Sequence, residues 1–196
     1  MSTLTDVEVD SHLWERVLSV APLVLVGTRE PDGDYDLAPK HRIVQLSDAH
    51  FAFVCSQRHS TYRNAVRERA FTVSWPQPAQ IAMTSAVSAP RCVDGEKRAM
   101  RALPTLPADH VDGVLLLGAY FVIECELDRI VADFGDDELI VGRVVAAHAD
   151  PAALRSVERP DAALVRARPL LTYVHPTQFS TVEHSTGFPF PKEFAR

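Results

Sequence analysis

Apolar and polar residues alternate along the chain with the two-residue period of a half-buried β-strand, most clearly in the segment 120–131. In such a strand, successive side chains point to opposite faces of the sheet. One face of this segment is apolar and is expected to pack into a core; it carries Ile123, Cys125 and Leu127. The other face is acidic and is expected to be solvated; it carries Glu124, Glu126 and Asp128.

Short apolar runs bounded by turn residues predict the other strands. The Asp32-Gly33 dipeptide is typical of a tight turn between antiparallel strands. It therefore predicts a hairpin of residues 22–28 and 35–45, with the second strand interrupted at Pro39. The remaining predicted strands cover residues 50–55, 71–75 and 138–148.

Helical spacing of apolar residues is present in three segments. The first would begin at Asp10 or Ser11 as its N-cap, and Ser60 has the same place before the second. The predicted helices cover residues 10–20, 61–70 and 94–103. The apolar face of the first helix would consist of Leu13, Trp14, Val17 and Leu18.

This succession of elements favours a mainly β fold with short helices. The strands do not alternate regularly with helices, so a closed or split antiparallel barrel is expected instead of a doubly wound sheet. Without repeats or a low-complexity linker, the chain is expected to form one domain, 1–196, with an N-terminal helix within 1–20. The proline-rich and aromatic segment 169–196 is expected to be an extended arm over the surface or over a partner subunit.

Composition excludes several classes of protein. The formal net charge of −6 argues against nucleic-acid binding. No apolar stretch approaches the roughly 20 residues needed to span a bilayer, and the polar start is no signal peptide. The odd number of cysteines (Cys55, Cys92 and Cys125) predicts reduced thiols in a cytoplasmic protein. The preference for arginine over lysine is typical of a bacterial protein with a GC-rich genome.

Common catalytic motifs are absent from the chain. It contains no dinucleotide-binding glycine motif, P-loop, nucleophile elbow or zinc-protease motif. His41, His50 and His59 recur every nine residues, but they fall on different predicted elements, and no metal site is expected from them.

The segment Cys55–Asn64 combines a strand end, a polar turn and a helix start. The first turn of a helix has free backbone N–H groups and partial positive charge, so anions bind there. Hydroxyls and cations add to this character; they belong to Arg58, His59, Ser60, Thr61 and Arg63. The pattern suits a phosphate monoester such as that of FMN. An ordinary capped helix with solvated arginines is the alternative.

The order of segments over residues 20–182 resembles the flavin-reductase-like, FMN-binding split-barrel family. DLAPKH, at 36–41, is similar to the family's N-x-A-P-x-S, and HSTYRN, at 59–64, to its K-D-T-x-x-N. No single motif is specific for the family, but the occurrence of all these motifs in the same order is. The later segments that match are IAMTSA, YFVIECEL, ELIVGRVVAAHAD and RPLLTYVHPTQFSTV.

The resemblance implies which residues hold the cofactor, FMN or alternatively FAD. The ring would lie along the backbone around Ala38-Pro39, with Ser85 near the ring or its pocket, and the phosphate would lie at Ser60 and Thr61. The full implied set is Asp36, Ala38, Pro39, Lys40, His41, Cys55, Ser56, Gln57, Arg58, Ser60, Thr61, Asn64 and Ser85.

Three positions depart from the family pattern. Asp36 stands where the family has Asn. His59 and Ser60 stand where the family has Lys and Asp, so Arg58 or Arg63 would have to supply the positive charge of that lysine at the phosphate. His41 replaces Ser and is the candidate catalytic residue, because it could donate to flavin N5 or O4; alternatively it fills the pocket.

The implied activity is NAD(P)H-dependent reduction of FMN by a homodimer, with nicotinamide as a transient donor. The reduced flavin would serve a partner oxygenase or reduce a small acceptor. Two alternatives share the same motifs: a flavoprotein oxidoreductase with its own small substrate, and a non-catalytic flavin or haem binder acting as a sensor or store. Neither nucleic acid nor membrane is expected as a partner.

Overall fold

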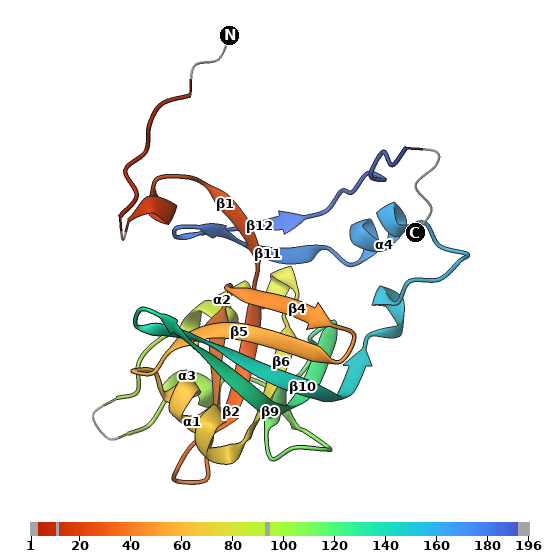
Figure 1. The fold of residues 1–196 in the computed structure, drawn as a ribbon. Helices are drawn as coiled ribbons and strands as arrows, with labels where there is room; N and C mark the ends of the chain where they lie inside the picture. Colours follow the sequence, from red (N-terminus) through yellow and green to blue (C-terminus); the bar gives the residue numbers. More distant parts are fainter. Residues whose placement is uncertain (1–3, 11, 93–94, 192–196) are drawn as a thin grey trace.

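The structure is a computed structural model that describes residues 4–10, 12–92 and 95–191 (Figure 1). Its centre is a seven-stranded antiparallel sheet in the order β3-β2-β6-β9-β10-β5-β4. These strands are β2 (Val24–Arg29), β3 (Tyr35–Lys40), β4 (Ile43–Ser47), β5 (His50–Ser56), β6 (Ala70–Trp75), β9 (Phe121–Phe134) and β10 (Asp137–Ala149).

The sheet curls into a barrel because its two edge strands are consecutive in the chain. β3 and β4 lie at opposite edges of the sheet, yet only His41 and Arg42 separate them. The edges must therefore approach each other at this corner, while no ladder joins them. The result is the mainly β split barrel expected from the sequence.

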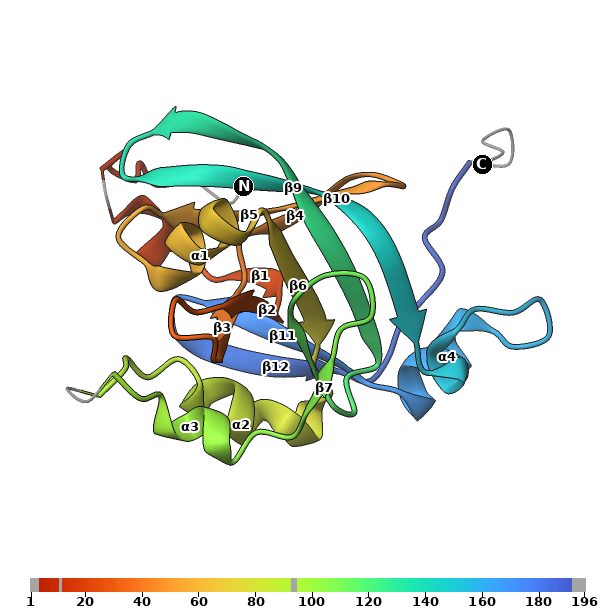
Figure 2. The same ribbon diagram turned by 90° about the horizontal axis from the view of Figure 1, so that it is seen from below.

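Two apolar clusters hold the barrel together. The larger lies inside the curled sheet and includes Phe51, Phe53, Phe71 and Trp75. The second lies outside β2 and β3, where α2 (Ile81–Ala86) and α3 (Arg98–Arg101) cover the sheet (Figure 2). It consists of Leu25, Leu37, Val87, Leu103, Val114 and Leu116.

The other elements are short. α1 (Ser60–Glu68) packs on β2, and its predicted extent is confirmed to within two residues. The predicted helix 94–103 is reduced to the four residues of α3, and position 94 lies outside the described residues. The remaining elements are β7 (Thr105–Pro107), β8 (Val114–Leu116), α4 (Asp161–Ala167) and the 3-10 turns η1 (Leu13–Glu15), η2 (Pro78–Gln80) and η3 (Pro151–Ala153).

The predicted N-terminal helix 10–20 is wrong. Among the described residues of this segment, only η1 is helical, and β1 (Ser19–Pro22) begins where the helix would end. The predicted apolar face does not pack well against the described chain, since Trp14 is 69% exposed. A short helix without such packing is only marginally stable in water. Ser11, one of its two proposed N-caps, lies outside the described residues.

The expected arm 169–196 is only partly extended. β11 (Leu170–His175) and β12 (Gln178–Val182) form a hairpin, and β1 pairs with β11 to complete a three-stranded sheet. Residues 183–191 follow without secondary structure. In the described residues, no helix is long and apolar enough to cross a membrane.

The break predicted at Pro39 falls instead after Lys40. Pro39 pairs with Leu25 inside β3. An edge strand accepts proline because one side of its backbone makes no ladder bonds. The chain therefore turns at His41 and Arg42, which places both residues at the corner of the barrel.

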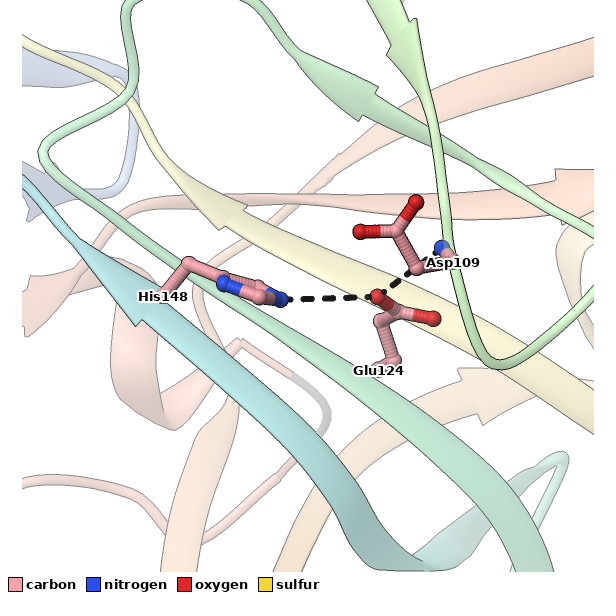
Figure 3. Close-up of side chains that lie close together, drawn as sticks. All are labelled: Asp109, Glu124 and His148. Atoms are coloured by element: carbon pink, nitrogen blue, oxygen red, sulfur yellow. Dashed lines mark hydrogen bonds and ion pairs between the residues drawn. The ribbon is translucent and has the colours of Figure 1, made fainter.

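Glu124 corrects the prediction of a solvated acidic face on β9. Its side chain is 0% exposed. The loop 108–113 covers it, and the carboxylate accepts the backbone N–H group of Asp109 at 3.1 Å (Figure 3). It also accepts the backbone N–H groups of His110 at 2.6 Å and Val111 at 3.0 Å. Since an unpaired buried carboxylate is very costly, these bonds fix the loop to the barrel. Glu126 lies on the expected exposed face.

Candidate functional site

A cleft of about 330 Å³ lies between the edge strand β3, the start of α1 and the segment 87–91. We call it the polar cleft. Six of the residues predicted to bind the cofactor line it: Asp36, Ala38, Pro39, Lys40, Ser60 and Thr61. Its other lining residues are His59, Val87, Ser88, Ala89, Pro90, Arg91 and Lys97.

The start of α1 gives this cleft its anion-binding character. The helix begins at Ser60, with His59 in the cap position that was expected of Ser60. His59 is extended and makes no side-chain capping bond, so the first-turn N–H groups are left to a ligand or to solvent. A phosphate at this point would meet those N–H groups and the positive end of the helix dipole.

Lysine and arginine side chains reach the cleft from elsewhere in the chain. Lys40, on β3, lies beside the start of α1 in this lining, and its Nζ donates to Cys55 Sγ at 3.3 Å. Arg91 forms an ion pair with Glu30 at 3.0 Å. Arg58 and Arg63, proposed as replacements for the family lysine, are not among the described residues that line the cleft.

Asp36 forms a buried ion pair with Lys97. The two side chains are almost fully buried, and Nζ lies 2.5 Å from Asp36 Oδ1. The same ammonium group also donates to the carbonyl oxygen of Leu37 at 3.2 Å. The acid that replaces the family Asn therefore presents a neutralised pair to the cleft, not a bare negative charge.

Lys97 and Arg91 were missed by the sequence analysis. Arg91 lies in a segment for which no strand or helix was predicted, and Lys97 lies in the predicted helix 94–103, which gave no indication of a contact with β3. The one available signal was composition, because Lys97 is one of only three lysines in the chain.

Gln57 and Arg58, in the turn between β5 and α1, make hydrogen bonds and ion pairs within the protein and are not among the described residues that line the polar cleft. Arg58 is 78% exposed and forms an ion pair with Asp136 at 2.7 Å. Gln57 donates to Glu138, as does the hydroxyl of Tyr62 at 2.6 Å, and this hydrogen bond raises the pKa of Tyr62 to about 12. Ser56 Oγ accepts the backbone N–H of Arg58. These three predicted residues and Cys55 lie outside the set that lines the polar cleft.

Asn64, the single asparagine, ties α1 to the barrel. It is buried, donates to Thr28 Oγ1 at 3.2 Å and accepts from Arg67 Nη1 at 3.0 Å. It is not among the lining residues of the cleft. In the described structure its contacts are therefore those of a packing residue.

A second cleft, of about 410 Å³, adjoins the first and shares Pro39 and Ser88 with it. We call it the apolar cleft. Ser85, predicted to lie near the ring or its pocket, is here. The other lining residues are Leu23, Ile81, Ala82, Thr84, Tyr173, Thr177, Gln178 and Phe179.

His41, the candidate catalytic residue, contacts Tyr173, which lines the apolar cleft. Its ring stacks on Tyr173 with centroids 4.3 Å apart, and His175 meets it edge-on at 5.6 Å. Burial lowers the pKa of His41, and the charges of His175, Arg42 and Lys40 lower it further. His41 is absent from the described lining of both clefts, and its observed contact joins the small sheet to the barrel.

Three potential metal-ligand side chains also meet elsewhere. Asp109, Glu124 and His148 bring ligand atoms within 4.8 Å of one another (Figure 3). Both oxygens of Glu124 already accept backbone N–H groups, and His148 Nε2 lies 3.8 Å from one of them. The arrangement is accounted for by closure of the loop 108–113.

The curled sheet, whose edge strands β3 and β4 are not joined by a ladder, is a split barrel. The sequence profile of the flavin reductase like domain matches residues 18–176. The chain belongs to this family. The family and the fold expected from the sequence are therefore confirmed.

Solved structures support the same fold. Flavoredoxin of Desulfovibrio vulgaris (Miyazaki F) has 19% identity and a TM-score of 0.76, over 98% of this chain and 99% of that chain. Nitrilotriacetate monooxygenase component B from Bacillus cereus has 15% identity and a TM-score of 0.79, over 96% and 100%.

The FMN-binding protein from Thermus thermophilus, with bound 1-cyclohex-2-enone, has 22% identity and a TM-score of 0.75, over 96% of this chain and 100% of that chain. The comparison with curated protein sequences finds no match. At these identities the likeness shows the fold alone.

The buried pair of Asp36 and Lys97 yields a test by double-mutant cycle. Lys97→Met leaves a buried carboxylate without its partner and should lower the free energy of unfolding by about 3 kcal/mol. Asp36→Asn/Lys97→Met should recover most of that loss, because neither charge remains. Urea unfolding of both single variants and the double variant measures the coupling; additive losses would contradict the assignment.

The environment of His41 predicts a dependence of stability on pH. Its pKa in the folded protein lies below the ordinary value of 6.5. The unfolded chain therefore binds the proton more tightly, and stability should fall as the pH drops below about 6.5. His41→Phe keeps a ring on Tyr173 and should reduce this fall between pH 7.5 and 5.5. His184→Phe, in the exposed tail, is the control; equal slopes for wild type and His41→Phe would refute the prediction.

Proposed function

We propose that the protein is an FMN-binding oxidoreductase that reduces its flavin with NAD(P)H. The observation that carries the proposal is the uncapped start of α1, which opens into the polar cleft beside Lys40. A helix start with hydroxyl and ammonium donors matches a phosphate monoester. Ser60, Thr61 and Lys40 would hold the phosphate of FMN.

The ring of the flavin would lie along β3 toward Pro39. Pro39 lines both clefts, so a ligand anchored at α1 reaches the apolar cleft by passing this residue. The ion pair of Asp36 and Lys97 would give the ring a polar but neutralised wall. FMN held there would supply two-electron redox chemistry, with a nicotinamide as the electron donor.

The nicotinamide would bind only transiently. This agrees with the described residues, which contain neither the glycine-rich motif nor the β-α-β arrangement of a dinucleotide-binding fold. The reduced flavin would then pass to a partner oxygenase or reduce a small acceptor at the apolar cleft. The apolar cleft favours the second outcome, which is also the role of a flavoprotein oxidoreductase with its own substrate.

The first test is optical. The purified protein should bind FMN on titration, and anaerobic stopped-flow mixing with NADH or NADPH should bleach the flavin absorbance. Protein that binds no flavin would refute the proposal. A bound flavin that neither nucleotide bleaches would support the non-catalytic sensor or storage role instead.

The phosphate site yields a matched substitution test. Lys40→Met should weaken FMN binding by about tenfold, because a charge-assisted contact is lost. It should change riboflavin binding little, since riboflavin has no phosphate. Arg129→Met removes an exposed cation on β9 and is the control. Equal effects of Lys40→Met on the two flavins, measured by fluorescence titration, would exclude Lys40 from the phosphate site.

We also propose a homodimer that forms through the three-stranded sheet. Val20 pairs with Val174, so both lie on one face, and Val20 is exposed. Trp14, Val17 and Leu18, just before β1 in the chain, are exposed apolar side chains as well. Monomeric proteins seldom leave such surfaces uncovered.

The dimer can be tested by light scattering. The wild-type protein should have twice the chain mass, and Val20→Glu should shift it to the monomer because a charge would be buried in the interface. Val157→Glu, at a fully exposed position outside this surface, should leave the mass unchanged. A wild-type monomer would contradict the proposal.

A further inference from the structure

The apolar cleft differs in chemistry from the polar cleft beside it. None of the described residues that line it carries a charged side chain. The polar cleft, in contrast, is lined by Asp36, Lys40, Arg91 and Lys97. An anion entering the apolar cleft would lose its hydration without gaining a counter-charge, which is costly. The lining therefore selects against charged ligands.

Thr84 gives the apolar cleft one unused polar group. Its side chain lies in the α2 wall and is 1% exposed, and its Oγ1 has no hydrogen-bond partner in the described structure. The neighbouring Ser88 differs, because its hydroxyl donates to the carbonyl of Ser85 at 2.7 Å. A buried hydroxyl without a partner costs about 1–3 kcal/mol. A ligand with a carbonyl oxygen would satisfy it.

Tyr173 provides a flat, fixed wall. Its hydroxyl donates to the carbonyl of Pro176, and His41 stacks on its ring. Both contacts hold the ring in one orientation. A cleft of about 410 Å³ with such a wall accommodates a planar molecule of modest size.

We propose that the apolar cleft binds the electron acceptor of the protein, and that this acceptor is an uncharged, planar carbonyl compound of the quinone type. The proposal rests on flavin binding at the adjoining polar cleft. The acceptor would hydrogen-bond to Thr84 through a carbonyl oxygen. A quinone becomes a hydroquinone by gaining two electrons and two protons, which the fully reduced flavin gives up as it returns to the oxidised form.

The test compares a neutral quinone with its anionic derivative. Protein loaded with FMN is reduced anaerobically and mixed with 1,4-naphthoquinone or 1,4-naphthoquinone-2-sulfonate, with free reduced FMN as the reference. The electron-withdrawing sulfonate makes the second compound the easier one to reduce. A protein that prefers the neutral compound by about tenfold, relative to free FMN, would support the proposal. A Cys92→Ser background avoids addition of the quinones to this exposed thiol.

Two variants address the cleft itself. Thr84→Val keeps the shape and should weaken the apparent affinity for 1,4-naphthoquinone by about three- to tenfold. Its stability should be unchanged or higher, because the lost hydroxyl had no partner. Ala82→Lys places a cation on the exposed rim and should improve the reaction with the sulfonate alone. Equal rates for both quinones, or an unchanged affinity in Thr84→Val, would overturn the proposal.

A binding measurement separates this proposal from the flavin proposal. Calorimetric titration of flavin-free protein with 1,4-naphthoquinone should show binding that Thr84→Val weakens. If the protein fails to retain FMN but binds the quinone, the flavin site is wrong and the apolar site stands. If it retains FMN but does not bind the quinone, the apolar site is wrong.

Discussion

The two-residue link between the edge strands β3 and β4 determines how the sheet curls, and the position of both clefts depends on this curl. β3 and β4 are far apart in the order of the sheet but adjacent in the chain, so the sheet has to curl at His41 and Arg42. Arg42 holds the corner through its carbonyl, which accepts from Val54 N at 2.9 Å, and through an ion pair with Asp137 at 2.7 Å. The curl leaves β3 as an edge against which a ligand cleft can form.

The same corner fixes the small sheet to the barrel. His41 projects from it onto Tyr173 of β11, and Tyr173 in turn lines the apolar cleft. The three-stranded sheet and its β11–β12 turn therefore supply one wall of this cleft, and α2 together with Leu23, Pro39 and Ser88 supplies the rest. A substitution at His41 is therefore expected to act on this cleft through Tyr173, because His41 itself is in neither lining.

The strands could be predicted because side-chain alternation and turn residues are local. The period of β9 correctly assigned Ile123, Cys125 and Leu127 to the core, but it could not reveal that a distant loop buries Glu124 on the opposite face. The helix predicted for residues 10–20 was wrong for a related reason. Its helical spacing is genuine, yet helix formation depends on a packing partner that the described chain does not supply.

Six of the residues that the resemblance named as cofactor-binding, on β3 and at the start of α1, come together in the polar cleft. Its balance of charge was not predictable, because nothing in the sequence indicated that Lys97, in the predicted helix 94–103, or Arg91, just before that helix, would line this cleft. Their contribution changes the chemistry of the site. Lys97 neutralises the charge of Asp36 in a buried pair, so the positive charge of Lys40 and the positive end of α1 are not offset by a free carboxylate there. The charged side chains therefore line the polar cleft, and the described lining of the adjoining apolar cleft contains none.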